Sequence, residues 1–161
     1  MSGVYLSNCY TGFAEVAGTQ VFPSDVKSGY MALVVTGDAA ISEEFLMYTD
    51  TSCSTPSMTW KQVRSDFTVG SASGSNYAVT YKEATLKVIV STDVANSHME
   101  TFAQSVGLSE TFTKGTESTI TDAQSTKHNL FLVTSTTVRH AQAGSSTPSE
   151  LDSMVMTKTC Q

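Results

Sequence analysis

The chain has 161 residues, of which 15 are acidic and 9 are basic, so its formal net charge is −6. No stripe of basic residues is present to neutralise phosphates, which argues against nucleic-acid binding, and no apolar run approaches the roughly 18 residues of a membrane-spanning helix. Serine and threonine account for 47 residues while charged residues are few, a balance that suits exported β proteins.

Short apolar or alternating segments follow one another along most of the chain and indicate β-strands. The buried run 29–37 and the segment 40–50 are separated by Gly37 and Asp38, which predicts a hairpin. Within 58–70 the alternation changes phase, and a β-bulge near Arg64 would restore the buried face. The other expected strands are 4–10, 14–22 before Pro23, two short strands with a corner near Glu83 in 77–92, a weak strand or two in 109–128, a strand–turn–strand unit in 129–144, and a closing strand in 154–160.

One segment has the periodicity of a helix instead. Between positions 93 and 107, apolar residues recur at the spacing of one helix face: Met99, Phe102, Ala103 and Val106. Asp93 is expected to cap the start of this helix by accepting hydrogen bonds from free first-turn N–H groups. Gly107 suits the left-handed position that follows the last turn.

Together these elements predict that residues 1–161 form a single all-β domain. Short sequential strands joined by hairpin-length turns favour an up-and-down antiparallel β-barrel over a parallel sheet. We expect about eight to ten strands and one short α-helix. Closure into a barrel would remove the exposed edges that an open sheet of this size has to protect.

The three cysteines, Cys9, Cys53 and Cys160, leave their pairing open. A Cys9–Cys53 bridge would close a long loop, and Cys9–Cys160 would join the first and last strands, which are neighbours in a closed barrel. Reduced thiols are a third possibility. No pair of cysteines or histidines has the spacing of a zinc site, so we expect no metal and no cofactor.

No catalytic constellation is recognisable in the sequence. His98 reads as a surface residue of the helix, whereas His128 and His140 flank the late hairpin as loop or strand-end residues. Glu43 and Glu44 are adjacent, and in a strand they would point to opposite faces. Asp50 is expected to shape a Thr/Ser-rich turn through hydrogen bonds to nearby backbone N–H groups.

Aromatic residues are spread over the expected strands, and those that face inward either fill a small barrel or line a ligand cavity. The sequence does not decide between these two outcomes. The candidate ligand-binding residues are Tyr30, Phe45, Tyr48, Trp60, Tyr81 and Phe131.

Several short motifs resemble those of small exported bacterial proteins with a lipocalin-like barrel, most of them of unknown function. "GVYLSNCY" resembles their G-x-[WY]-x-S-x-C opening, "FLMYTDTSC" their Y-x-D-x-x-C segment, and "HNLFLVTSTTVRHAQAG" and "STPSELDSMVMTKT" their late hairpin and closing segment. The resemblance implies a lipocalin-like barrel, an exported protein and a disulfide between Cys9 and Cys53.

The leading functional hypothesis is an exported protein that binds a small apolar molecule in the mouth of the barrel. The opening "MSGVYLSNCY" has neither the basic start nor the apolar stretch of a signal peptide, which leaves a cytosolic protein or a mature exported form. The low charge and the excess of serine and threonine favour the second, so we expect a mature secreted or periplasmic form. One alternative is a non-catalytic scaffold, inhibitor or envelope component with a filled barrel. Another is an enzyme of the same fold that acts on a bound chromophore or lipid. The oligomeric state stays open.

Overall fold

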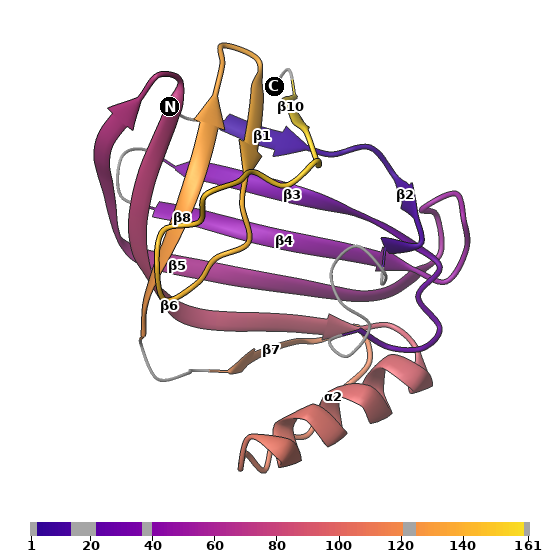
Figure 1. The fold of residues 1–161 in the computed structure, drawn as a ribbon. Coiled ribbons are helices and arrows are strands. Elements are labelled where there is room, and N and C mark those ends of the chain that lie inside the picture. The colour runs from indigo at the N-terminus through magenta and orange to yellow at the C-terminus, as the bar shows by residue number, and fades with distance from the viewer. Residues whose placement is uncertain (1–2, 14–21, 37–39, 121–124, 160–161) are drawn as a thin grey trace.

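The computed structural model describes residues 3–13, 22–36, 40–120 and 125–159. These residues form ten strands and a helix that Figure 1 labels α2. The strands of the first half are β1 (Gly3–Leu6), β2 (Tyr10–Thr11), β3 (Ser28–Thr36), β4 (Ala40–Tyr48) and β5 (Pro56–Ser73). The remaining elements are β6 (Asn76–Val90), α2 (Asp93–Ser105), β7 (Glu117–Ile120), β8 (Thr126–Val133), β9 (Thr137–His140) and β10 (Met156–Lys158).

Eight of these strands close into an antiparallel barrel. The order around the barrel is β1-β10-β9-β8-β6-β5-β4-β3, and β3 pairs back with β1, where Tyr5 lies opposite Leu33. β2 extends the pairing of β3, and β7 pairs with the second half of β6. β1 and β10 pair with each other, so the first and last strands of the chain are neighbours in the barrel (Figure 1). The predicted all-β barrel with one short helix is therefore confirmed.

The hairpin β5–β6 is the longest in the barrel and contains the predicted irregularity. Val63 pairs with Thr85 and Arg64 with Glu83, so Ala84 is an extra residue on β6. Between Ser65 and Thr68, β5 in turn has one residue more than β6, and Asp66 there has φ +52°. This irregularity confirms the predicted bulge near Arg64, whereas the two short strands expected in 77–92 are one continuous strand. A bulge absorbs the extra residue and bends the strand without ending it.

The helix begins one residue earlier than expected. Thr92, and not Asp93, is the N-cap, because its Oγ1 accepts a hydrogen bond from the Ala95 amide at 3.0 Å. The same hydroxyl donates to Asp25 at 2.7 Å, which attaches the start of the helix to the segment before β3. At the other end, Gly107 has φ +78° and takes the left-handed position as predicted.

The inner face of the barrel is densely filled with apolar side chains, and the helix adds to this core. Ala95, Met99 and Ala103 face the strands and are fully buried, and Figure 1 shows the helix below β6 and β7. Burying a large apolar side chain such as that of Met99 stabilises the fold by about 1.5–3 kcal/mol. The largest fully buried side chains are Tyr5, Tyr81, Phe13, Phe131, Leu33, Met47, Met58, Met99, Met156, Val88, Val90 and Val138.

Some expectations fall on parts of the chain outside the described residues. These are most of the expected strand 14–22, the Gly37-Asp38 turn and the pairing of Cys160. Within the described ranges, the helix is too short and too polar to cross a membrane.

Candidate functional site

The six candidate aromatic residues divide between the two faces of the barrel wall. Phe45 lies opposite Met31 and Trp60 in the register, on the face that carries the core. Tyr81 and Phe131 belong to the same core and are almost fully buried. The predicted inward placement therefore holds for Phe45, Trp60, Tyr81 and Phe131.

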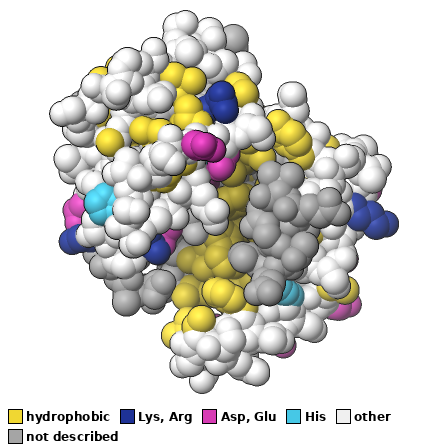
Figure 2. All heavy atoms as spheres, in the orientation of Figure 1, with side chains coloured by type: hydrophobic (Ala, Val, Ile, Leu, Met, Phe, Trp, Pro, Cys, Tyr) yellow, Lys and Arg dark blue, Asp and Glu magenta, His cyan; other side chains and the backbone are white. Residues whose placement is uncertain are grey.

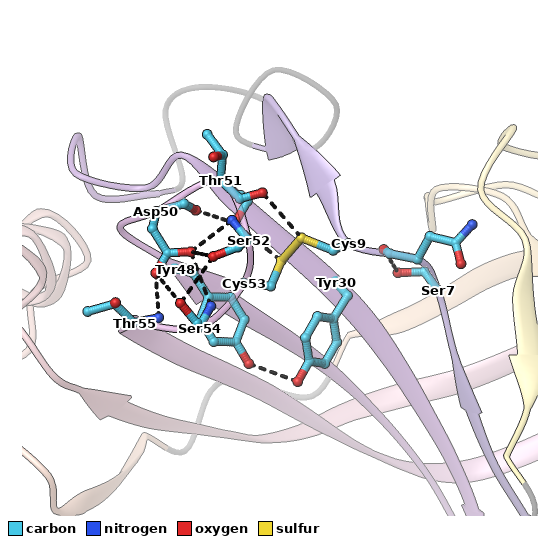
Figure 3. Close-up of a disulfide and its surroundings, with 12 residues drawn as sticks. Ser7, Cys9, Tyr30, Tyr48, Asp50, Thr51, Ser52, Cys53, Ser54 and Thr55 are labelled. Carbon is cyan, nitrogen blue, oxygen red and sulfur yellow. Dashed lines mark hydrogen bonds between the residues drawn. A yellow bond between two sulfur atoms is a disulfide. The ribbon is translucent and has the colours of Figure 1, made fainter.

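Tyr30 and Tyr48 lie on the opposite face, so the expectation that they line the interior is wrong. They alternate along β3 and β4 with the core residues Met31 and Met47. Their hydroxyl groups meet, with Tyr48 Oη donating to Tyr30 Oη at 2.8 Å (Figure 3). Burial and this hydrogen bond raise the pKa of Tyr48, so its phenol is neutral. Whether any of the six residues contacts a ligand stays a prediction.

The same region contains the disulfide. Cys9 and Cys53 are bonded, with 6.1 Å between their Cα atoms, and the bridge joins the segment between β1 and β2 to the turn between β4 and β5 (Figure 3). Asp50 shapes this turn as expected, because its carboxylate accepts hydrogen bonds from the amides of Ser52 at 2.8 Å and Thr55 at 2.6 Å. Hydrogen bonds from Thr55 and Ser52 hold the pKa of Asp50 well below its usual range. The turn between β4 and β5 is thus stabilised by the disulfide and by the hydrogen bonds of Asp50.

The barrel interior contains a cluster of ionisable side chains that the sequence interpretation missed. Glu43 on β4, Arg64 on β5 and His140 on β9 are 3%, 3% and 6% exposed. Arg64 Nη2 donates to Glu43 Oε2, and His140 Nε2 lies 2.8 Å from Glu43 Oε1. We call these three residues the interior ion cluster. The expectation that Glu43 and Glu44 face opposite sides was right, and the apolar neighbours Ile41, Phe45 and Met47 place Glu43 inside.

The electrostatics of the cluster favour ionised side chains. Burial by itself raises the pKa of Glu43, but the charges of Arg64 and His140 outweigh it and lower the pKa to about 2. Burial opposes a charge on His140 as well, yet the neighbouring Glu43 carboxylate raises the pKa of His140 above its usual value. His140 is a strand-end residue, as expected, but its ring is enclosed in the interior.

Neutral polar and aromatic groups surround the guanidinium of Arg64. Its Cζ lies 4.3 Å from the centre of the Tyr81 ring, a cation–π geometry. Asn129 Nδ2 lies 3.4 Å from the Tyr81 hydroxyl, and burial raises the pKa of Tyr81, so this phenol is uncharged. Gln62 Oε1 is 3.5 Å from Arg64 Nη2. The buried Nε and Nη1 atoms of Arg64 have no hydrogen-bond partner among the described residues.

Beside this cluster, a pocket of about 180 Å³ lies between the helix and the inner face of β5, β6 and β7. Figure 2 shows hydrophobic side chains in the hollow of this face of the molecule. The rings of Trp60 and Phe102 meet edge to face in the pocket wall, with 5.4 Å between their centres. The lining residues are Trp60, Gln62, Glu83, Thr85, Leu86, Phe102, Val106, Leu108 and Ile120.

Of the six candidate aromatic residues, Trp60 is the one in this pocket wall. The helix and β7 supply Phe102 and Ile120, which the sequence interpretation did not connect with binding. Their apolar character was visible in the sequence, but their position in this pocket wall depends on how the helix packs and how β7 pairs with β6. Within the described ranges, no three His, Cys, Asp or Glu side chains are arranged to hold a metal ion.

No known protein-family model matches this chain, and the comparison with curated proteins finds no significant relative. The barrel fold is compatible with ligand binding, and the assignment of a function depends on the site itself.

Proposed function

We propose that this protein is an exported binding protein that takes up a small, mainly apolar molecule in the pocket between the helix and the barrel interior. The observation that carries the proposal is the pocket itself, whose wall combines an aromatic pair, aliphatic side chains and a few polar groups. A mainly apolar wall with a few placed polar groups is the usual composition of small-molecule sites.

The size of the pocket limits the ligand. At about 180 Å³ it is smaller than the roughly 300–1,000 Å³ of sites for drug-sized molecules. The ligand is therefore small, or only part of it enters. A single aromatic ring or a short aliphatic chain against Trp60 and Phe102 matches this space.

Two features support an exported protein. The Cys9–Cys53 disulfide is typical of oxidising compartments, and the motifs around both cysteines resemble those of small exported bacterial proteins. Mass analysis after alkylation, with and without reductant, tests whether Cys9 and Cys53 are bonded in protein isolated from its natural source. Alkylation of both Cys9 and Cys53 without reduction would contradict an oxidising compartment.

The binding proposal can be tested through Trp60, the only tryptophan in the chain. Small neutral aromatic probes such as 3-phenylpropionamide should change its fluorescence in a saturable way. Native mass spectrometry of protein from its natural source should show a small molecule bound in a stoichiometric amount. If no ligand is found and no probe saturates, the proposal is wrong.

Two valines near the ends of the helix provide a matched pair of variants. Val106 lines the pocket and is 54% exposed, whereas Val94 is 43% exposed on the same helix and is not part of the lining. Val106→Phe should weaken probe binding because the larger ring occupies pocket space. Val94→Phe should leave binding unchanged, since it adds the same surface away from the pocket.

A filled, non-catalytic scaffold is the second candidate, and one observation favours it. Leu33, Met47 and Met58 are no more than 1% exposed, so their part of the interior is occupied by side chains. Absence of a ligand and of probe binding in the experiments above would support this candidate.

A further inference from the structure

We propose that the ligand of this barrel carries a carboxylate group and that Arg64 binds this group at the inner end of the pocket. The inference rests on the proposed binding function and specifies the chemical class of the ligand. It assigns a role to the interior ion cluster, which the pocket alone does not explain.

The first argument is the set of unused donors on Arg64. Its Nη2 atom contacts Glu43 and Gln62, but Nε and Nη1 are buried and lack a partner among the described residues. A buried guanidinium nitrogen without an acceptor is costly, because it has given up its hydrogen bonds to water. A carboxylate oxygen can accept a hydrogen bond from one of these nitrogens, and arginine is well suited to bind a carboxylate.

The second argument is charge. With His140 protonated, Arg64 and His140 provide two positive charges against one negative charge on Glu43. Two further groups at the guanidinium, Tyr81 and Gln62, are uncharged. An anionic ligand would therefore balance the cluster, whereas a cationic ligand would add to its excess.

The only carboxylate in the described pocket lining, Glu83, already has a cationic partner. Its Oε2 atom lies 3.7 Å from Lys127 Nζ, between the paired strands β6 and β8. This pairing offsets the repulsion that Glu83 would exert on an entering anion.

The third argument is position. Gln62 lines the pocket and also contacts Arg64, and Glu83 lines the pocket and pairs with Arg64 in the strand register. Side chains two residues apart on a strand are about 7 Å apart on the same face. A ligand body against Trp60 would thus direct a polar group toward Gln62 and Arg64. The Gln62–Arg64 contact is long, at 3.5 Å, and a charge-assisted bond of about 2.7–2.9 Å would replace it favourably.

The test compares acids with their uncharged amides of nearly the same shape. Benzoate, phenylacetate, 3-phenylpropionate and hexanoate are each titrated beside the corresponding amide, with Trp60 fluorescence as the readout. At least one acid should bind about tenfold more tightly than its amide, as expected for a hydrogen bond to a charged group. Arg64→Met should remove this preference, so that each acid and its amide bind the variant with similar affinity.

Arg139 provides the matched control, because the chain contains only two arginines. Its guanidinium donates to the Asp152 carbonyl at 2.7 Å at the surface. Arg139→Met should keep the preference for the acid. If acids and amides bind equally well to the natural protein, the carboxylate inference is wrong while the binding function stands. If no acid or amide binds, both are wrong.

A measurement on the natural protein keeps the test decisive if Arg64→Met does not fold. In ¹H–¹⁵N spectra, the two arginine Nε–Hε signals can be assigned with the Arg139→Met variant. Addition of the acid should shift the Arg64 signal and leave that of Arg139 in place, and the amide should shift neither. A saturable Trp60 response to the acid without a shift at Arg64 would overturn the inference.

Discussion

Glu43 and Asp50 are two carboxylates on the same stretch of chain, and both have a lowered pKa. The donors of Asp50 lie within five residues of it, in a partly exposed turn. Those of Glu43 come from β5 and β9, and the group is buried. The first is stabilised by local backbone geometry and the second by closure of the barrel. Both pKa values are lowered, but loss of the Glu43 contacts and loss of the Asp50 contacts should change the free energy of unfolding by different amounts.

The largest difference between the two regions should appear on removal of the interior carboxylate. Glu43→Gln leaves Arg64 and His140 buried without their anion, and breaking such a pair costs about 3–5 kcal/mol of the free energy of unfolding. Glu44→Gln is the matched control, because the neighbouring Glu44 forms a partly exposed ion pair with Lys61 at 2.7 Å. This control should lose less than about 1 kcal/mol. Urea unfolding measures both, and equal losses would contradict a special role for the interior ion cluster.

In the turn region around Asp50, the Cys9–Cys53 disulfide should make the largest single contribution to the free energy of unfolding. The bonded cysteines are separated by 44 positions, and the chain-entropy model gives up to about 4 kcal/mol for a loop of this length. The double variant Cys9→Ser/Cys53→Ser should lower the urea midpoint accordingly. Reductant should lower the midpoint of the natural protein by a similar amount and leave that of the variant unchanged. An unchanged midpoint of the natural protein under reductant would show that the bridge adds nothing.

Acid should separate the contribution of Glu43 from those of the other carboxylates. Its pKa falls from an ordinary value of 4.5 in the unfolded chain to about 2 in the fold, so its stabilisation is present above pH 4.5 and is lost as the pH falls toward 2. The difference in unfolding free energy between the natural protein and Glu43→Gln should shrink by about 3 kcal/mol over this interval. A difference that stays constant with pH would contradict the lowered pKa.

The raised pKa of His140 gives stability the opposite dependence on pH. Its stabilisation is complete below its ordinary value of 6.5 and is lost as the pH rises through the higher folded value. The interior ion cluster should therefore contribute most between about pH 4.5 and 6.5. His140→Gln should flatten the alkaline side of this stability profile, which urea unfolding at a series of pH values would show.

The smallest effect is expected for Asp50→Asn. The amide keeps one acceptor oxygen, and water can reach the donors that lose their partner, so the melting temperature should fall less than in Glu43→Gln. The double variant Glu43→Gln/Asp50→Asn tests the independence of the two regions. Its loss should equal the sum of the single losses to within about 0.5 kcal/mol, since the sites share no partners. A larger deviation would show that the turn and the interior are coupled.

Local patterns were sufficient to predict much of the fold. A continuous apolar run indicated β3, the turn residues after it indicated β4, and alternation indicated β5. The change of phase near Arg64 indicated the bulge, and Gly107 marked the end of the helix. The cap was misplaced by one residue because Thr92 and Asp93 are both suitable capping residues. The predicted inward orientation of Tyr30 and Tyr48 was wrong because β3 and the end of β4 carry apolar residues on both faces, so the pattern on these strands does not identify the inner side.

The sequence by itself determined most of the described strands, the helix and the turn at Asp50, because each depends on residues close together in the chain. The motifs around Cys9 and Cys53 also indicated the correct disulfide. Only the tertiary structure decided that Glu43, Arg64 and His140 meet inside the barrel and that the helix forms a pocket wall over Trp60. These contacts join β4, β5, β9 and α2, and their geometry is set by barrel closure and helix packing, which no local pattern specifies.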